Sequence, residues 1–431
     1  MGISLRLRGH FRQSPRNVTV KGLLVHFGVR MGCQVKFMPK ALFPPVRHPL
    51  WVLAGCFFVG VPLAESWDEH VLVTRASLSS APGLHDQLVP YTRFESLLRD
   101  LGVPSPRQFN ESIQIPKEYA FLPKLGETEG AGVPILEVLA AYSDEPDWGM
   151  DKEIFGEYPA VWRPEYSRMG GRAGTPSQAF RHMYWPEFSW RMPLRTLKSP
   201  VRKLFSPLGL APERAALFID LSRKARAAGH LYWSARFVAN ALHYLEDVAQ
   251  PFHASQTPTK RVLLMPLFDR DHGNGTTNYV LQVQNIIAYY HFAFEKYVGR
   301  QMREYYAGQN SRSGKQFVAA LAGDPSERAE TGPAGIAELV IALAGVSVRE
   351  SARAARSSMN FFPPIEQRFD AFDPERSVAE DRWWNATMRN SELDSAARGE
   401  HIGVVNEMFR HLGGALRTVV RAEVVETLSR R

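Results

Sequence analysis

The sequence predicts an all-α protein, a single multi-helix domain with a helical C-terminal extension. Apolar residues recur at three- and four-residue spacing through most of the chain, which is typical of helices buried on one face. We find no convincing run of alternating apolar and polar residues, and no internal repeat. The composition, 45% hydrophobic and 22% charged residues in 431, is that of a globular protein with a sizeable core.

The first element along the chain is a basic prefix, residues 1–66, with nine Lys or Arg residues and a single acid, Glu65. The rest of the chain holds basic and acidic residues in equal number, so the net charge of +8 does not argue for polyanion binding. Within the prefix, an apolar run from Leu50 to about Leu63 is too short for a good transmembrane helix. Small residues then precede Trp67, as at a signal cleavage site. We therefore expect a secretory signal at 38–66 and a secreted or periplasmic mature protein beginning at Trp67.

Both cysteines, Cys33 and Cys56, lie in this prefix. The mature chain would contain neither a disulfide nor a thiolate ligand, so any metal must be held by His, Asp, Glu or backbone groups. The "LAGC" segment ending at Cys56 also resembles a lipoprotein cleavage box. Anchoring there ranks second, because the apolar "FFVGVPL" that follows is a poor exposed tether.

Nine segments after the prefix have helical apolar spacing, and Pro-, Gly- and Ser-rich loops separate them. None of the loops is long or biased enough to be a clear interdomain linker. The expected helices are residues 70–80, 90–100, 134–142, 212–228, 232–250, 278–300, 316–323, 334–356 and 400–427.

The segment "HYLEDVAQPFH" (243–253) ends the fifth of these helices. His243 and Asp247 are four residues apart and share a helical face, so both can reach one ion. Pro251 ends the helix, and His253 follows from a different backbone direction. A second helix repeats the i, i+4 spacing with His291 and Glu295. One such pair is a weak signal, but two pairs plus His253 in a chain without cysteine ligands favour a metal site.

Other catalytic patterns are missing from the sequence. It contains no G-x-S-x-G and no H-E-x-x-H, and "GQNSRSGKQ" (308–316) has the wrong spacing for a P-loop.

"ALHYLEDVAQPFHA" resembles the signature of the bacterial zinc-dependent phospholipase C and alpha-toxin family, whose relatives include the zinc single-strand nucleases. The resemblance implies zinc ligands at His243, Asp247 and His253, and "YHFAFEKYV" is similar to the family element that would place ligands at His291 and Glu295. It implies a fold of the zinc-dependent phospholipase C type, with a catalytic domain at 67–310 and a helical extension at 311–431 packed on the same domain.

Three weaker matches lie upstream in the family's order. Trp67 stands where the family has an N-terminal Trp that binds zinc through its amine and carbonyl, and His70 follows it closely. "EPDWGMD" places a ligand at Asp147, and "RHMYWPE" places one at His182. Read without the family order, His70 and His182 are better explained as ordinary, partly buried histidines.

The resemblance also carries departures and competing residues. Asp144 and Asp151 compete with Asp147, which only the Pro-Asp-aromatic match favours. Glu246 replaces the family's small residue before the aspartate and adds a charge beside the site. His401 and His411, ten residues apart on a later helix, are interpreted as structural.

The resemblance implies three zinc ions, and zinc suits these nitrogen and oxygen donors. It also makes Asp147 the candidate general base or water-orienting carboxylate. The implied ligand sets are Asp147, His182, His243 and Asp247 for one ion, His253, His291 and Glu295 for a second, and Trp67, His70 and a bridging Asp247 for the third.

The predicted function is a phosphodiesterase of the phospholipase C type, which releases a phosphorylated head group from a phospholipid. The match around Trp67 and His70 and the neutral mature chain favour this substrate, with peripheral membrane contact and no obligate protein partner. A single-strand-specific nuclease is the alternative, and a zinc-binding relative with reduced catalysis is the third interpretation.

Overall fold

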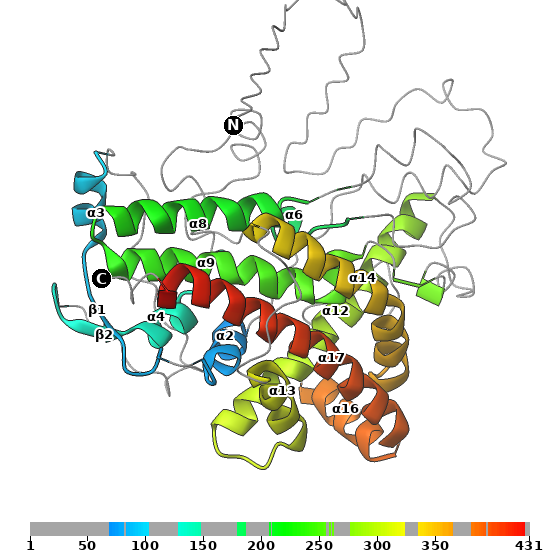
Figure 1. Ribbon diagram of the computed structural model, residues 1–431. Coiled ribbons are helices and arrows are strands. Elements are labelled where there is room, and N and C mark those ends of the chain that lie inside the picture. The colour runs from blue at the N-terminus through cyan, green and yellow to red at the C-terminus, as the bar shows by residue number, and fades with distance from the viewer. Residues whose placement is uncertain are drawn as a thin grey trace, which may run out of the picture. The chain divides into compact units, whose positions relative to one another are not determined.

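Helices account for most of the chain that the structure describes, as the apolar spacing predicts (Figure 1). The structure is a computed structural model, and the prefix, the signal segment and Trp67 lie outside its described residues. The described residues are 69–81, 83–102, 128–147, 179–186, 207, 209–255, 258–259, 261–262, 276–323, 335–364, 381–393 and 395–426.

Each of the nine expected helices corresponds to an observed one, with shifts of up to several residues at the ends. The helices are α2 (His70–Leu78), α3 (Phe94–Asp100), α4 (Ile135–Ala141), α6 (Ala179–His182), α8 (Ala211–Ala227), α9 (Leu231–Ala249), α10 (Pro251–Ala254), α12 (Thr276–Tyr306), α13 (Arg312–Ala322), α14 (Ile336–Phe361), α16 (Asp381–Leu393) and α17 (Ser395–Val420), and a π-helical turn, η4 (Arg421–Val425), continues α17.

Besides the nine expected helices, the structure contains the short helices α6 and α10, a pair of strands and helix α16, none of which was expected from the sequence. The start of the expected helix 90–100 is instead the end of a strand, β1 (Leu88–Pro90), which pairs antiparallel with β2 (Gly132–Pro134). Strands of three residues are too short to show an alternating pattern, although Val89 and Val133 face each other and are both buried. Helix α16 was missed because its sequence, "DRWWNATMRNSEL", is mostly polar and buries chiefly two tryptophans.

Helices α8 and α9 form a hairpin that lies along one side of the described chain (Figure 1). Gly229 makes the turn between them with a φ of 90°, a left-handed conformation that disfavours residues with a Cβ atom. Helix α9 is buried along almost its whole length, because α4, α8, α14 and α17 all pack against it. A helix covered on every side positions its side chains rigidly, and α9 is the helix that carries "HYLED".

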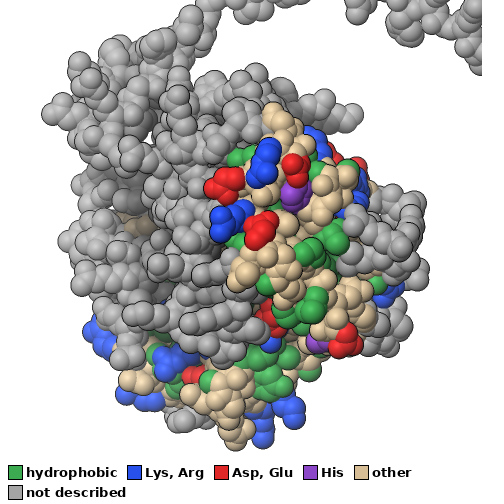
Figure 2. All heavy atoms as spheres, turned by 90° about the vertical axis from the view of Figure 1, so that its left-hand side faces the viewer, with side chains coloured by type: hydrophobic (Ala, Val, Ile, Leu, Met, Phe, Trp, Pro, Cys, Tyr) green, Lys and Arg blue, Asp and Glu red, His purple; other side chains and the backbone are tan. Residues whose placement is uncertain are grey.

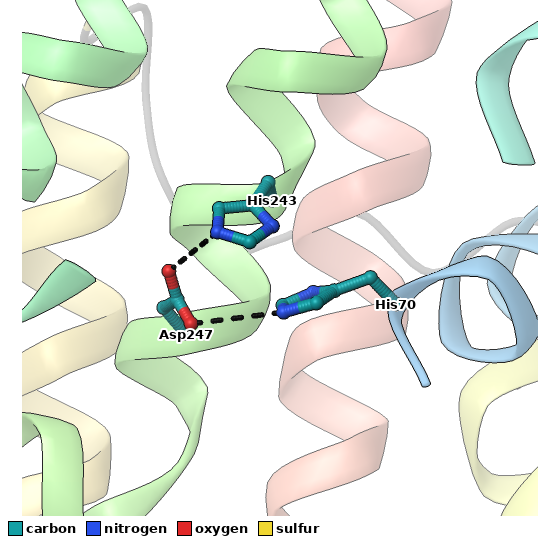
Figure 3. A group of neighbouring side chains, drawn as sticks. All are labelled: His70, His243 and Asp247. Carbon is teal, nitrogen blue, oxygen red and sulfur yellow. Dashed lines mark ion pairs between the residues drawn. The ribbon is translucent and has the colours of Figure 1, made fainter. Parts of the chain in front are cut away.

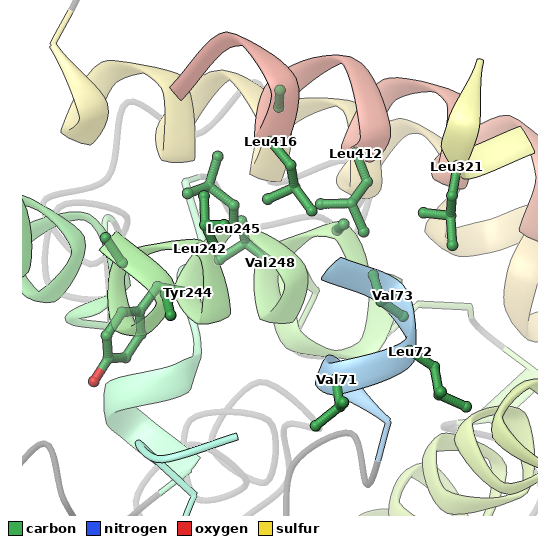
Figure 4. Packing of buried hydrophobic residues seen from close by; sticks show 14 of the residues in the cluster. Val71, Leu72, Val73, Leu242, Tyr244, Leu245, Val248, Leu321, Leu412 and Leu416 are labelled. Carbon is green, nitrogen blue, oxygen red and sulfur yellow. The ribbon is translucent and has the colours of Figure 1, made fainter. Parts of the chain in front are cut away.

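The core around α9 is one continuous hydrophobic cluster. Apolar side chains from α2, α9, α13 and α17 meet in it (Figure 4). Those drawn and labelled are Val71, Leu72, Val73, Leu242, Tyr244, Leu245, Val248, Leu321, Leu412 and Leu416.

The C-terminal helix α17 packs against α2 as well as against α9, α13 and α14. The Nη1 atom of Arg417 donates to the carbonyl oxygens of Leu321, at 2.6 Å, and of Ser77, at 3.2 Å. Gly413 permits this close approach, since a Cβ atom there would lie 2.0 Å from the Leu321 oxygen. The last described helix thus helps to fix α2, the short helix that begins with His70.

Acidic and basic side chains lie next to one another in the upper part of the described face that Figure 2 shows. This part of the surface is therefore not a patch of one charge. No helix among the described residues is both long and apolar enough to cross a membrane.

Candidate metal centre

His70, His243 and Asp247 form the first of three groups of side chains that could hold a metal ion (Figure 3). His243 Nε2 lies 3.0 Å from Asp247 Oδ2, and His70 Nε2 lies 3.7 Å from Asp247 Oδ1. His243 and Asp247 are in contact because they lie four residues apart on α9. His70 comes from another helix, α2. All three residues are fully buried.

The second group contains Asp147, His182 and His243, so that His243 belongs to both groups. Asp147 follows α4 in a turn, and His182 ends the short helix α6. His182 Nδ1 lies 2.8 Å from both His243 Nε2 and Asp247 Oδ2. Asp147 Oδ1 lies 3.5 Å from His182 Nδ1 and 3.4 Å from His243 Nε2.

The third group consists of His253, His291 and Glu295. His253 Nε2 is 2.8 Å from His291 Nε2, which is itself 2.8 Å from Glu295 Oε1. This group adjoins the first, because His253 Nδ1 lies 3.6 Å from Asp247 Oδ1.

The break between α9 and α10 brings His253 to this position. Gln250 is extended, with a ψ of 122°, and its side-chain oxygen caps α10 by accepting from the Phe252 backbone N–H. Pro251 begins α10, where a missing N–H costs nothing. The Gln250 amide also donates to Glu295 Oε1 at 3.2 Å, which ties the break to the third group.

Main-chain carbonyls fix the orientation of two of the histidine rings. His243 Nδ1 donates to the Ser143 carbonyl at 2.8 Å, and His253 Nδ1 donates to the His182 carbonyl at 3.2 Å. In the neutral form that metal binding requires, each bond keeps the ring proton on Nδ1 and leaves Nε2 open toward a neighbouring carboxylate, Asp247 for His243 and Glu295 for His253. An imidazole held through one nitrogen and open at the other is the usual arrangement of a metal ligand.

The buried charges also favour a cation. Asp247 is fully buried and Glu295 is 5% exposed, while Asp147 is 19% exposed at its side chain. Burial opposes ionisation of Asp247, but His243 and His182 outweigh it and lower its pKa. Burial likewise opposes protonation of His243, but Asp247 and Asp147 outweigh it and raise its pKa. Without metal, a proton on His243 offsets part of the carboxylate charge, and a bound cation would take over that role.

His182 provides a further indication. Its Nε2 atom is buried and has no hydrogen-bond partner in the described part of the chain. Its Nδ1 atom instead faces His243, Asp147 and Asp247 together, a crowding of acceptors that suits a shared cation better than one proton.

The structure brings together eight of the nine residues expected at the site, and Trp67 lies outside the described residues. Asp147, and not Asp144, belongs to the metal-type groups among the described residues, and Asp151 is not described. Away from the groups, His401 is buried among aromatic side chains and His411 is about half exposed.

Sequence reasoning missed the residues that surround the ligands. The Ser143 and His182 carbonyls carry no side-chain signal, and Gln250 was part of the quoted motif without an assigned role. Glu246 was noted as an added charge, and the structure shows its carboxylate against His70.

Comparison with known proteins leaves this site without a named relative. No family model, no curated protein and no solved structure matches the chain.

Proposed function

We propose that the protein is a zinc-dependent phosphodiesterase of the phospholipase C type. The observation that carries the proposal is the junction of three buried His/Asp/Glu groups, two of which share His243 while Asp247 lies beside the third. Five histidines and three carboxylates supply only nitrogen and oxygen donors. Such donors suit zinc. Adjoining metal sites suit the hydrolysis of a phosphodiester, because the attacking oxygen and the leaving oxygen both need charge stabilisation.

The ligand assignment starts from the three groups and gives His243, which belongs to two of them, to the ion of the second group. Asp147, His182, His243 and Asp247 would hold one ion, and His253, His291 and Glu295 a second. His70 and Asp247 would hold the third together with the amine and carbonyl of Trp67. Zinc, when bound, supplies Lewis acidity toward a phosphoryl oxygen and makes water more acidic.

Asp147 is the proposed acceptor for the proton of the attacking water. Its side chain is 19% exposed, whereas those of Asp247 and Glu295 are 0% and 6% exposed, so it is the site carboxylate that solvent and substrate can reach. Its oxygens also lie farther from the histidines, at 3.4 Å or more, than those of Asp247 at 2.8 Å. A carboxylate less committed to its neighbours is freer to orient water or accept a proton.

The proposed substrate is a phospholipid, from which the enzyme would release the phosphorylated head group. The resemblance of the segments around His70 and His182 to the phospholipase branch supports this choice. Reaching such a substrate requires peripheral contact with a lipid surface. A phospholipid substrate also fits the expected secretion signal at residues 38–66, which lie outside the described residues. The "QPFH" core is common to the nuclease branch, so single-stranded DNA is the alternative substrate.

The test is metal analysis and turnover of the purified mature chain. We expect about three zinc ions per chain, loss of turnover on chelation, and recovery when zinc is returned. Release of phosphocholine from phosphatidylcholine vesicles, with no cleavage of single-stranded DNA, would support the lipid substrate. The opposite result would favour the nuclease, and zinc without either activity would favour a scaffold with reduced catalysis. A chain with no bound zinc would refute the proposal.

A further inference from the structure

Glu246 is a buried carboxylate that the proposed ligand sets do not use. It lies on α9 directly before Asp247 and is 1% exposed. One of its oxygens, Oε2, lies 2.6 Å from His70 Nδ1. In the part of the chain that the structure describes, no Lys or Arg forms an ion pair with it.

The second oxygen of Glu246 is held by the same helix as the first. Thr74 donates its hydroxyl to Glu246 Oε1 at 2.5 Å. His70 and Thr74 are one helical turn apart on α2, so both face α9. Both carboxylate oxygens are therefore engaged by one face of α2.

The two nitrogens of the His70 ring have different partners. Nδ1 meets Glu246, while Nε2 faces Asp147 at 3.5 Å and Asp247 at 3.7 Å, in the direction of the first metal-type group. When a cation is bound at Nε2, the ring proton is on Nδ1. Nδ1 then donates a hydrogen bond to the Glu246 oxygen. His243 and His253 use main-chain carbonyls for the same purpose, and His70 uses a side chain.

We propose that Glu246 is a positioning residue for His70, holding its ring so that Nε2 is presented to the metal ion of the first group. The inference rests on the metal binding in the proposed function and adds to it a residue that acts through His70. A carboxylate that accepts from a ligand histidine orients the ring and makes it a stronger donor, and its loss typically weakens metal binding about 10- to 100-fold.

A purely structural role explains Glu246 poorly. A buried carboxylate without a cationic side chain is costly to desolvate, and an apolar residue of similar size would fill the same space at no such cost. Glu246 bonds from α9 to α2, and other residues of these two helices, such as Val71 and Leu245, are apolar members of the hydrophobic core. A carboxylate at this position is explained if it orients a side chain that has a function. The ring that it contacts is that of His70.

The experiment measures zinc affinity by competition with a chelating dye, and the absorption spectrum after replacement with Co²⁺, for the mature chain and its variants. Glu246→Leu removes the acceptor, and we expect one of the bound ions to weaken about 10- to 100-fold while the others stay unchanged. Glu246→Gln retains a neutral acceptor and should lose less. Thr74→Val frees one carboxylate oxygen and should lose several-fold at the same ion, which provides a second reading if the leucine variant does not fold.

Two reference variants make the test specific. Glu137→Gln removes another buried carboxylate that binds α2, through Arg75, and should leave every ion unchanged. His70→Ala removes the ligand itself, and Glu246→Leu in that background should cause no further loss, because Glu246 acts through His70.

The possible results separate the inference from the proposed function. If the unmodified chain binds no zinc, the proposed function fails before Glu246 is tested. If it binds zinc and Glu246→Leu binds every ion as tightly, or weakens all of them equally, the positioning role is refuted while the proposed function stands. Further weakening by Glu246→Leu when His70 is already absent would refute it as well.

Discussion

The turn that carries Asp147 is clamped to α9 by a buried ion pair, and breaking that pair should destabilise both the fold and the site. Arg236 and Glu145 are each 2% exposed. Arg236 Nε donates to Glu145 Oε1 at 2.9 Å, and Nη2 donates to the same oxygen. Asn240 donates to Glu145 Oε2 at 2.9 Å, so both carboxylate oxygens are satisfied. The guanidinium also lies 4.0 Å from the centre of the Tyr142 ring.

The perturbation is Glu145→Gln, which removes the carboxylate charge that Arg236 bonds in the core. Removing one partner of such a pair costs about 3–5 kcal/mol of unfolding free energy. At an unfolding entropy of about 2.1 cal/mol/K per residue, each kcal/mol lowers the Tm of a chain of residues 67–431 by about 1.3 °C, so the variant should melt about 4–7 °C lower. The amide oxygen still accepts one bond from Arg236, which favours the lower part of this range. Because Glu145 is two residues from Asp147, zinc at the Asp147 group should weaken as well.

The assay is thermal unfolding followed by circular dichroism, with zinc content measured on the same samples. Glu407→Gln is the matched control, since its partner Arg410 is 51% exposed and such a pair contributes less than about 1 kcal/mol. Replacing Arg236 by Met in the Glu145→Gln chain should restore part of the stability, because it removes the buried charge that has lost Glu145. A Glu145→Gln chain that melts no lower than Glu407→Gln would refute the reasoning.

Three further predictions concern the site and the core. Asp147→Asn should keep most of the zinc and lose about 10²- to 10⁴-fold in turnover, because a neutral amide cannot accept the proton of water. A chain that begins at Pro62 should hold the third zinc more weakly than one that begins at Trp67, because an amide nitrogen offers no lone pair to the ion. Burial lowers the pKa of His401 to about 3, so its protonation favours the unfolded state as the pH falls below about 6.5. His401→Phe should therefore remove about 2 kcal/mol of the destabilisation that the unmodified chain suffers between pH 7 and pH 5.

Each of these predictions has a result that contradicts it. If Asp147→Asn keeps full turnover, Asp147 is not the base. If the variant loses its zinc, Asp147 is chiefly a metal ligand. Equal zinc and equal rates for the two N-termini would remove Trp67 from the site. Parallel pH–stability curves for the unmodified chain, His401→Phe and His411→Phe, the half-exposed control, would show that His401 contributes nothing.

The helices and the ligand pairs were predictable because they depend on local rules. A 3.6-residue period places His243 over Asp247 and His291 over Glu295 wherever the rest of the chain lies. Pro251 likewise marks the end of a helix by its missing N–H. These rules act within a few residues, and the sequence displays them directly.

The assembly of the pairs into one centre was not derivable from spacing. It depends on α2 crossing α9 and on the turn after α4 reaching His243, and both are contacts between residues about 100 or more apart in the chain. In the sequence, only the resemblance predicts His70, Asp147 and His182 at the site. The hydrogen bonds that orient the rings were beyond prediction for another reason, since a carbonyl acceptor leaves no trace in the sequence.

Helix α9 carries a row of polar side chains that also indicates the site. Arg236, Asn240, His243 and Asp247 follow one another at four-, three- and four-residue steps, so they form a polar stripe along one face. In an ordinary surface helix such a stripe faces water, but α9 is buried on every side. Buried polar groups must be satisfied by partners, and here the upper part of the stripe clamps the turn at 142–147 while the lower part meets the metal-type groups. A polar stripe within a helix that is otherwise apolar therefore indicates where a chain builds a site, before any motif is recognised.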